Sequence, residues 1–121
     1  IPTNDRLTSF PHTSGCLSLP MPEKEWTVAF GDFALIVRRT TSKGRMVEFA
    51  VVLVAFISGK WRDITRYDTA HGTPHRDILG VNQGLRFKRW MDDIEFAEAF
   101  DYAISDCTEN AESYLADFLA H

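Results

Sequence analysis

Side chains that could carry out chemistry gather in one short stretch of the sequence, residues 66–77 (RYDTAHGTPHRD). Histidine accepts or donates a proton near neutral pH, which suits it to general acid–base catalysis. Arginine holds phosphate groups and stabilises developing negative charge. The candidate catalytic residues in this stretch are Arg66, Asp68, His71, His75 and Arg76.

Cleavage of an RNA phosphodiester is the first interpretation, because the 2′-hydroxyl group of RNA supplies an internal nucleophile. In this hypothesis His71 and His75 act as the base and the acid. Arg66 and Arg76 hold the phosphate and stabilise its negative charge. The reaction needs no cofactor and no metal ion, so we expect neither.

A metal site is the second interpretation of the same residues. His71 and His75 are four residues apart, Asp68 and Asp77 flank them, and these side chains suit a divalent transition ion. A spacing of four brings two side chains together when they lie on a helix. A glycine and a proline between the two histidines argue against a helix, so the sequence favours metal-free chemistry.

A purely structural role is the third interpretation. Ion-pair networks that only stabilise a fold gather the same side chains as catalytic sites do. Asp68 can accept hydrogen bonds from the backbone of the loop that follows it. In that case the protein is a non-catalytic interaction protein that uses the same loop to hold a partner.

The composition is that of one globular domain of 121 residues. No apolar run approaches the roughly 20 residues that span a bilayer, so we expect no membrane partner. The two cysteines, Cys16 and Cys107, form no CxxC pair, which agrees with a reducing, cytoplasmic setting.

The net charge of −4 is distributed unevenly along the chain. Residues 92–121 hold nine of the 17 acidic side chains and none of the 13 basic ones. Such a run is usually a solvated helical face. The remaining basic excess could also attract a phosphate backbone, which makes RNA a candidate partner.

The pattern of the first 91 residues predicts strands. Prolines at four positions make residues 1–25 an irregular arm. β-Branched and aromatic residues predict strands at 26–40, 45–58 and 61–69, the first with a bulge or break at Gly31. A shorter hairpin follows at 75–79 and 85–90.

Two of these strands constrain the positions of the candidate residues. The strand at 45–58 is apolar on both faces, so it belongs in the middle of the sheet. In the strand at 61–69, strict alternation places Arg66 and Asp68 on one face and Trp61 and Tyr67 on the other.

Two helices are expected at the C-terminus. Asp92 and Glu95 match a helix-capping box before a helix that extends to about Cys107, and Thr108 can cap the second helix. We therefore predict an α+β domain, with an antiparallel sheet of about four or five strands and two C-terminal helices on one face. The other face of the sheet would need cover, which favours a homodimer.

Three segments of the chain resemble a known group of proteins. They are residues 59–61 (GKW), 66–72 (RYDTAHG) and 74–77 (PHRD), followed by an acidic helix. Over roughly residues 45–105 the chain resembles a small family of uncharacterised prokaryotic proteins. More loosely, it is similar to the TumE-type toxins of toxin–antitoxin pairs. The sequence departs from the toxin pattern at Gly72, where the toxins have a second adjacent histidine.

The resemblance implies an accessory gene product of a mobile or defence-related kind. It also implies RNA as a target and an antitoxin-like protein as a partner. Arg66, Asp68, His71, His75 and Arg76 would then form the site of a toxin-like ribonuclease.

Overall fold

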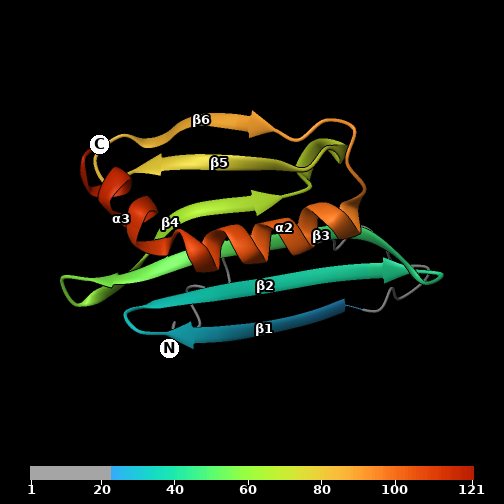
Figure 1. The fold of residues 1–121 in the computed structure, drawn as a ribbon, viewed down its shortest axis with the longest axis horizontal. Helices are drawn as coiled ribbons and strands as arrows, with labels where there is room; N and C mark the ends of the chain where they lie inside the picture. The colour runs from blue at the N-terminus through green and yellow to red at the C-terminus, as the bar shows by residue number, and fades with distance from the viewer. Residues whose placement is uncertain (1–22) are drawn as a thin grey trace.

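The computed structural model describes residues 23–121, except for the side chain of His71. Six strands form one antiparallel sheet in which each strand lies beside its neighbours in sequence (Figure 1). The strands are β1 (Glu23–Phe30), β2 (Phe33–Ser42), β3 (Arg45–Ile57), β4 (Lys60–Asp68), β5 (His75–Gly80) and β6 (Gly84–Trp90).

The sheet has six strands and not four or five, because the predicted first strand is a hairpin. Residues 31 and 32 form the turn between β1 and β2, and Phe30 pairs directly with Phe33. Gly31 has a φ of 58°, a conformation that suits glycine and reverses the chain. The sheet also begins at Glu23, inside the predicted irregular arm. The rest of that arm lies outside the described residues.

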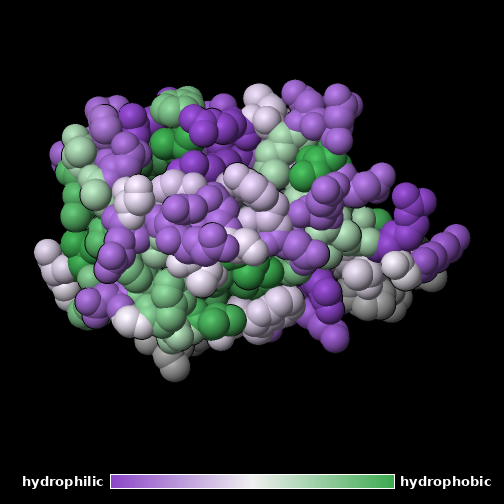
Figure 2. Space-filling model, viewed as in Figure 1, coloured by the Kyte–Doolittle hydropathy of each residue, from purple (hydrophilic) through white to green (hydrophobic). Residues whose placement is uncertain are grey.

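Two helices, α2 (Phe96–Glu109) and α3 (Ala111–Leu119), cover one face of the sheet (Figure 1). The inner side of α2 buries small and aromatic side chains, and the Phe100 ring lies 5.6 Å from the Phe49 ring on β3. The α+β prediction is therefore confirmed. Hydrophilic side chains cover much of the outer surface of the helices (Figure 2). Neither helix is long and apolar enough to cross a membrane.

The predicted helix caps are wrong. Helix α2 starts after Glu95 without a side-chain cap, because the residues before it form a turn in which Asp93 has a φ of 60°. Thr108 lies inside α2, where its hydroxyl donates to the Ile104 carbonyl at 2.7 Å. A single-residue junction at Asn110 separates the two helices.

The sheet has apolar side chains on both faces at its centre, as predicted for the second of the expected strands. On the helix face, Val51 and Leu53 of β3 join the core formed with α2 and α3. On the opposite face, here called the back face, Val52 and Val54 belong to a separate buried cluster. The two sides of β3 therefore contribute to two different cores.

A β-bulge in the pairing of β3 with β4 changes which side chains share a face. Leu53 pairs with Thr65 and Val54 pairs with Asp63, so Ile64 is an extra residue on β4. Strict alternation fails there. Trp61 joins the back-face cluster, whereas Tyr67 is buried in the core on the helix face. The prediction that these two aromatic side chains share a face is wrong.

Candidate functional site

Five ionisable side chains from three neighbouring strands meet on the back face of the sheet. Arg66 pairs with Asp77, Asp68 pairs with His75, and Asp77 pairs with Lys88. Side chains of directly paired residues in an antiparallel sheet lie on the same face. The group, called the Asp77 cluster below, consists of Arg66, Asp68, His75, Asp77 and Lys88.

Asp77 is the buried centre of this cluster. Its side chain is 5% exposed, and each of its oxygens pairs with a different cation. Arg66 Nη2 lies 3.1 Å from Oδ2, and Lys88 Nζ lies 2.8 Å from Oδ1. The side chains of Arg66 and Lys88 are 35% and 32% exposed. The two cations are therefore accessible from solvent, whereas the carboxylate that anchors them is not.

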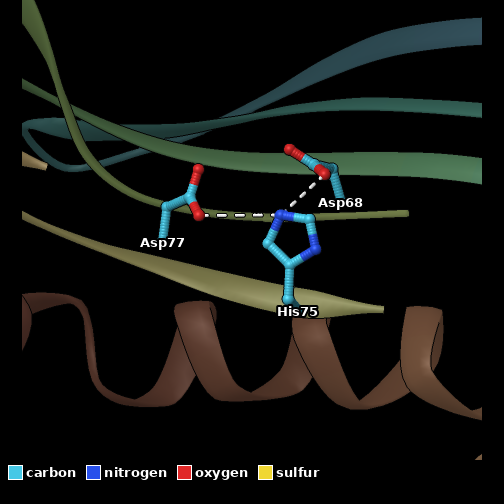
Figure 3. Close-up of side chains that lie close together, drawn as sticks. All are labelled: Asp68, His75 and Asp77. Atoms are coloured by element: carbon cyan, nitrogen blue, oxygen red, sulfur yellow. Dashed lines mark ion pairs between the residues drawn. The ribbon is translucent and has the colours of Figure 1, made fainter. Parts of the chain in front are cut away.

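His75 has one ring nitrogen tied to the backbone and the other between two carboxylates. Nδ1 lies 3.1 Å from the Thr73 carbonyl oxygen, which can only accept, so Nδ1 carries a hydrogen. Nε2 lies 3.0 Å from Asp68 Oδ1 and 3.6 Å from Asp77 Oδ1 (Figure 3). The ring is 1% exposed, and Nε2 has no partner with hydrogen-bond geometry among the described residues.

Asp68 connects this cluster to the loop after β4. Its Oδ1 accepts a hydrogen bond of 2.9 Å from the Ala70 backbone N–H, which holds the short 3₁₀ helix η1 (Ala70–Gly72) in place. The side chain is 25% exposed. Asp68 is therefore the more accessible of the two carboxylates. On the other side of the cluster, the Trp90 ring lies 4.9 Å from His75 and is 46% exposed.

The structure brings together three of the five candidate catalytic residues. Arg66, Asp68 and His75 meet around Asp77. Arg76 is on the helix face, because it pairs with Tyr67 and alternates with His75 and Asp77 along β5. The backbone of His71 is in η1, and its side chain lies outside the described residues. Two arginines therefore do not converge on one phosphate.

Two further residues of the site, Lys88 and Trp90, lie outside the motif that the sequence singled out. Both lie on β6, at least 11 residues from the motif at 66–77. In the sequence, only the predicted hairpin of β5 and β6 indicated that these two residues could belong to the site. The observed register of that hairpin places Lys88 opposite Asp77 and Trp90 opposite His75.

A second polar group lies between the helix face and the helices. Asp106 accepts hydrogen bonds from Tyr67 Oη at 2.6 Å, Tyr114 Oη at 2.7 Å and Asn110 Nδ2 at 2.8 Å. The Arg76 guanidinium lies 3.9 Å from the centre of the Tyr114 ring. This group, called the Asp106 cluster below, consists of Tyr67, Arg76, Asp106, Asn110 and Tyr114.

The Asp106 cluster keeps its hydroxyl groups protonated. Burial, followed by the hydrogen bond to Asp106, raises the pKa of Tyr67 far above its usual range, and the same causes raise the pKa of Tyr114. Burial raises the pKa of the neighbouring Cys107 thiol to about 12, so this cysteine is no nucleophile at neutral pH. A cavity of about 210 Å³ adjoins the cluster and is lined in part by Arg76 and Tyr102.

Comparison with known proteins places the chain in a family without providing an activity. Residues 21–121 match the family described as a domain of unknown function (DUF7718), so the chain belongs to that family. No curated protein and no solved structure matches the chain.

Proposed function

We propose that this member of the family of domains of unknown function (DUF7718) is a toxin-like protein that acts on RNA at the Asp77 cluster. One observation carries the proposal. Two solvent-accessible cations, Arg66 and Lys88, lie on the same sheet face as the half-exposed Trp90 ring. Proteins bind single-stranded RNA with this combination, because cations contact the phosphates and an aromatic ring stacks on a base.

The burial of the site assigns different roles to its members. Arg66 and Lys88 contact a phosphodiester, and Asp68 is the accessible carboxylate that accepts the proton of the attacking 2′-hydroxyl. As the 2′-oxygen bonds to phosphorus, the bond from phosphorus to the 5′-oxygen breaks, and this oxygen takes a proton from solvent water. His75 is 1% exposed and cannot touch a substrate, so it positions Asp68. This assignment replaces the two-histidine mechanism that the sequence suggested.

A non-catalytic RNA-binding or partner-binding protein is the second candidate. The burial of His75 favours it, because the best proton-transfer group of the motif has one nitrogen tied to Thr73 and cannot reach an RNA substrate. A cytoplasmic homodimer controlled by an antitoxin-like partner would suit either candidate.

Binding of a fluorescent single-stranded RNA to the full chain tests the proposal. We expect Trp90→Leu to weaken binding by about tenfold, since stacking on one base is worth about 1–3 kcal/mol. Lys88→Gln should weaken binding and reduce its dependence on salt concentration. Tyr102→Leu is the matched control, because Tyr102 is 54% exposed on helix α2 and away from the back face.

The same assay separates the two candidates. Cleavage of the RNA that stops when the attacked position carries a 2′-deoxy sugar supports the ribonuclease. Binding without cleavage supports the non-catalytic candidate. Absence of binding, or equal losses in the Trp90 and Tyr102 variants, would overturn RNA as the ligand of this face.

A further inference from the structure

We infer that the Asp77 cluster contains a binding site for one divalent transition-metal ion. The ligands are Asp68, His75 and Asp77, which each place one ligand atom within 4.8 Å of the others. The closest contacts are those of His75 Nε2 with Asp68 Oδ1 and Asp77 Oδ1. They come from two adjacent strands, β4 and β5, so the sheet fixes their relative positions. The sequence alone suggested a metal only with both His71 and His75, and this site does not use His71.

The orientation of His75 is the main observation. Its Nδ1–H is committed to the Thr73 carbonyl, so the neutral ring carries its lone pair on Nε2. Nε2 faces two carboxylate oxygens in a buried place, which is unfavourable unless a proton or a metal ion lies between them. Metal-binding histidines almost always donate the other ring N–H to a carbonyl or a carboxylate. Figure 3 shows both carboxylates directed at the same nitrogen.

The angles at Nε2 do not fit a hydrogen bond, and the distances around it fit shared coordination. Asp68 Oδ1 is only 3.0 Å away, yet Nε2 has no partner with hydrogen-bond geometry in the part of the chain that the structure describes. An ion about 2.1 Å from each ligand keeps neighbouring ligand atoms roughly 3.0–3.4 Å apart in octahedral or tetrahedral geometry. The observed separations of 3.0 and 3.6 Å from Nε2 are close to this range.

Lys88 is the competitor for this site. Its Nζ lies 2.8 Å from Asp77 Oδ1, the oxygen that would bind the ion. Binding therefore requires the ammonium group to leave that oxygen, while Arg66 continues to pair with Oδ2. One imidazole and two carboxylates suit Zn²⁺, Mn²⁺ or Co²⁺ rather than a soft ion such as Cu⁺.

A bound ion would also change the charge of the cluster. When His75 is neutral, the positive charges of Arg66 and Lys88 balance the negative charges of two aspartates, so the net charge of the cluster is zero. A bound divalent ion would raise that net charge to +2. Such a charge attracts phosphate. The role of the ion in RNA binding rests on the proposed function, whereas binding of the ion itself does not.

Titration of the metal-free full chain with Zn²⁺, and with Co²⁺ as a spectroscopic probe, tests the inference. We expect one ion per chain. Asp68→Asn and His75→Gln should each reduce the affinity for the ion roughly 100-fold. Loss of a group that only hydrogen-bonds to a metal ligand costs about 10- to 100-fold, and these two variants alter ligands themselves. Lys88→Gln should bind several-fold more tightly. Asp117→Asn is the control, because Asp117 is also an ion-paired aspartate, 2.9 Å from Arg86 and far from the site in sequence.

The Lys88 variant keeps the test decisive if His75→Gln fails to fold, because a misfolded protein does not gain affinity. Absence of binding by the unaltered chain, or equal affinity of that chain, Asp68→Asn and Lys88→Gln, would overturn the inference. Tight metal binding by a chain that neither binds nor cleaves RNA would overturn only the proposed function. RNA binding or cleavage that persists in a chain shown not to bind metal would overturn only the metal site.

Discussion

The Asp106 and Asp77 clusters lie on opposite faces of the same strands, yet their aspartates have different surroundings. Asp106 receives three uncharged donors, which are two tyrosine hydroxyls and the Asn110 amide. Asp77 receives two charged groups, Arg66 and Lys88, and lies beside His75 Nε2, which has no hydrogen-bond partner among the described side chains.

This difference provides a criterion for distinguishing a polar network that only stabilises the fold from a binding site. A fully hydrogen-bonded polar network fixes a unique packing, and it needs nothing further. A buried polar atom without a partner costs free energy and calls for an explanation, such as a missing ion or a functional role. By this criterion the Asp106 cluster joins the helices to the sheet, and we expect the Asp77 cluster to bind a ligand.

Removal of Asp106 should give the largest effect on stability. Asp106→Ala leaves the buried Tyr67 hydroxyl and the Tyr114 hydroxyl without their acceptor, and we expect a loss of roughly 3 kcal/mol in the free energy of unfolding. Urea denaturation followed by circular dichroism measures it. Asp101→Ala, an exposed aspartate on the same helix, is the control and should change stability little. A small loss in Asp106→Ala would mean that the network does not hold the helices.

Tyr67 should make the stability of the fold sensitive to alkaline pH. Burial and the hydrogen bond to Asp106 raise the pKa of Tyr67 in the folded chain. Above about pH 10 the unfolded chain loses this proton while the folded chain keeps it, so stability falls as pH rises. We expect this residue to contribute a slope of about 1.4 kcal/mol per pH unit there.

Comparison with Tyr67→Phe isolates that slope. The variant loses one hydrogen bond at every pH, so it is less stable at pH 8, but the gap should narrow as pH increases above 10. Free energies of unfolding at several alkaline pH values measure the gap. A gap that stays constant would show that the phenol does not resist ionisation in the folded chain.

The sequence predicts the elements of this fold better than it predicts their faces. The long apolar strand, the β5–β6 hairpin and the apolar stripe of α2 all follow from periodicity. The Gly31 turn is hidden because apolar, strand-forming residues continue on both sides of it. The bulge at Ile64 is hidden as well, since it depends on how β3 pairs with β4.

For the site, the sequence identifies the motif but not its geometry. Arg66, Asp68 and His75 alternate on paired strands, so their convergence follows from a correct hairpin register. Arg76 is next to His75 in sequence and for that reason points to the other face. Lys88 enters only through pairing with Asp77, a contact between strands whose register no local pattern determines.

Of the three aspartates in the two clusters, we expect Asp68 to contribute least to stability and most to metal binding. In Asp68→Asn the side-chain oxygen still accepts from the Ala70 N–H, and the side chain is partly exposed, so we expect a change within about 0.5 kcal/mol for the metal-free chain. Chemical denaturation in the presence of a chelator measures it.

Asp77→Asn sharpens the contrast within the same cluster. Its carboxylate is buried and pairs with two cations, so its neutralisation should cost roughly 2 kcal/mol even without metal. If Asp68→Asn instead destabilised the metal-free chain as much as Asp77→Asn, the Asp68–His75 contact would itself be a strong ion pair. In that case a proton on Nε2, and not a metal ion, would lie between His75 and the carboxylates. The two clusters would then differ only in that Asp106 accepts from uncharged donors and Asp77 from charged ones.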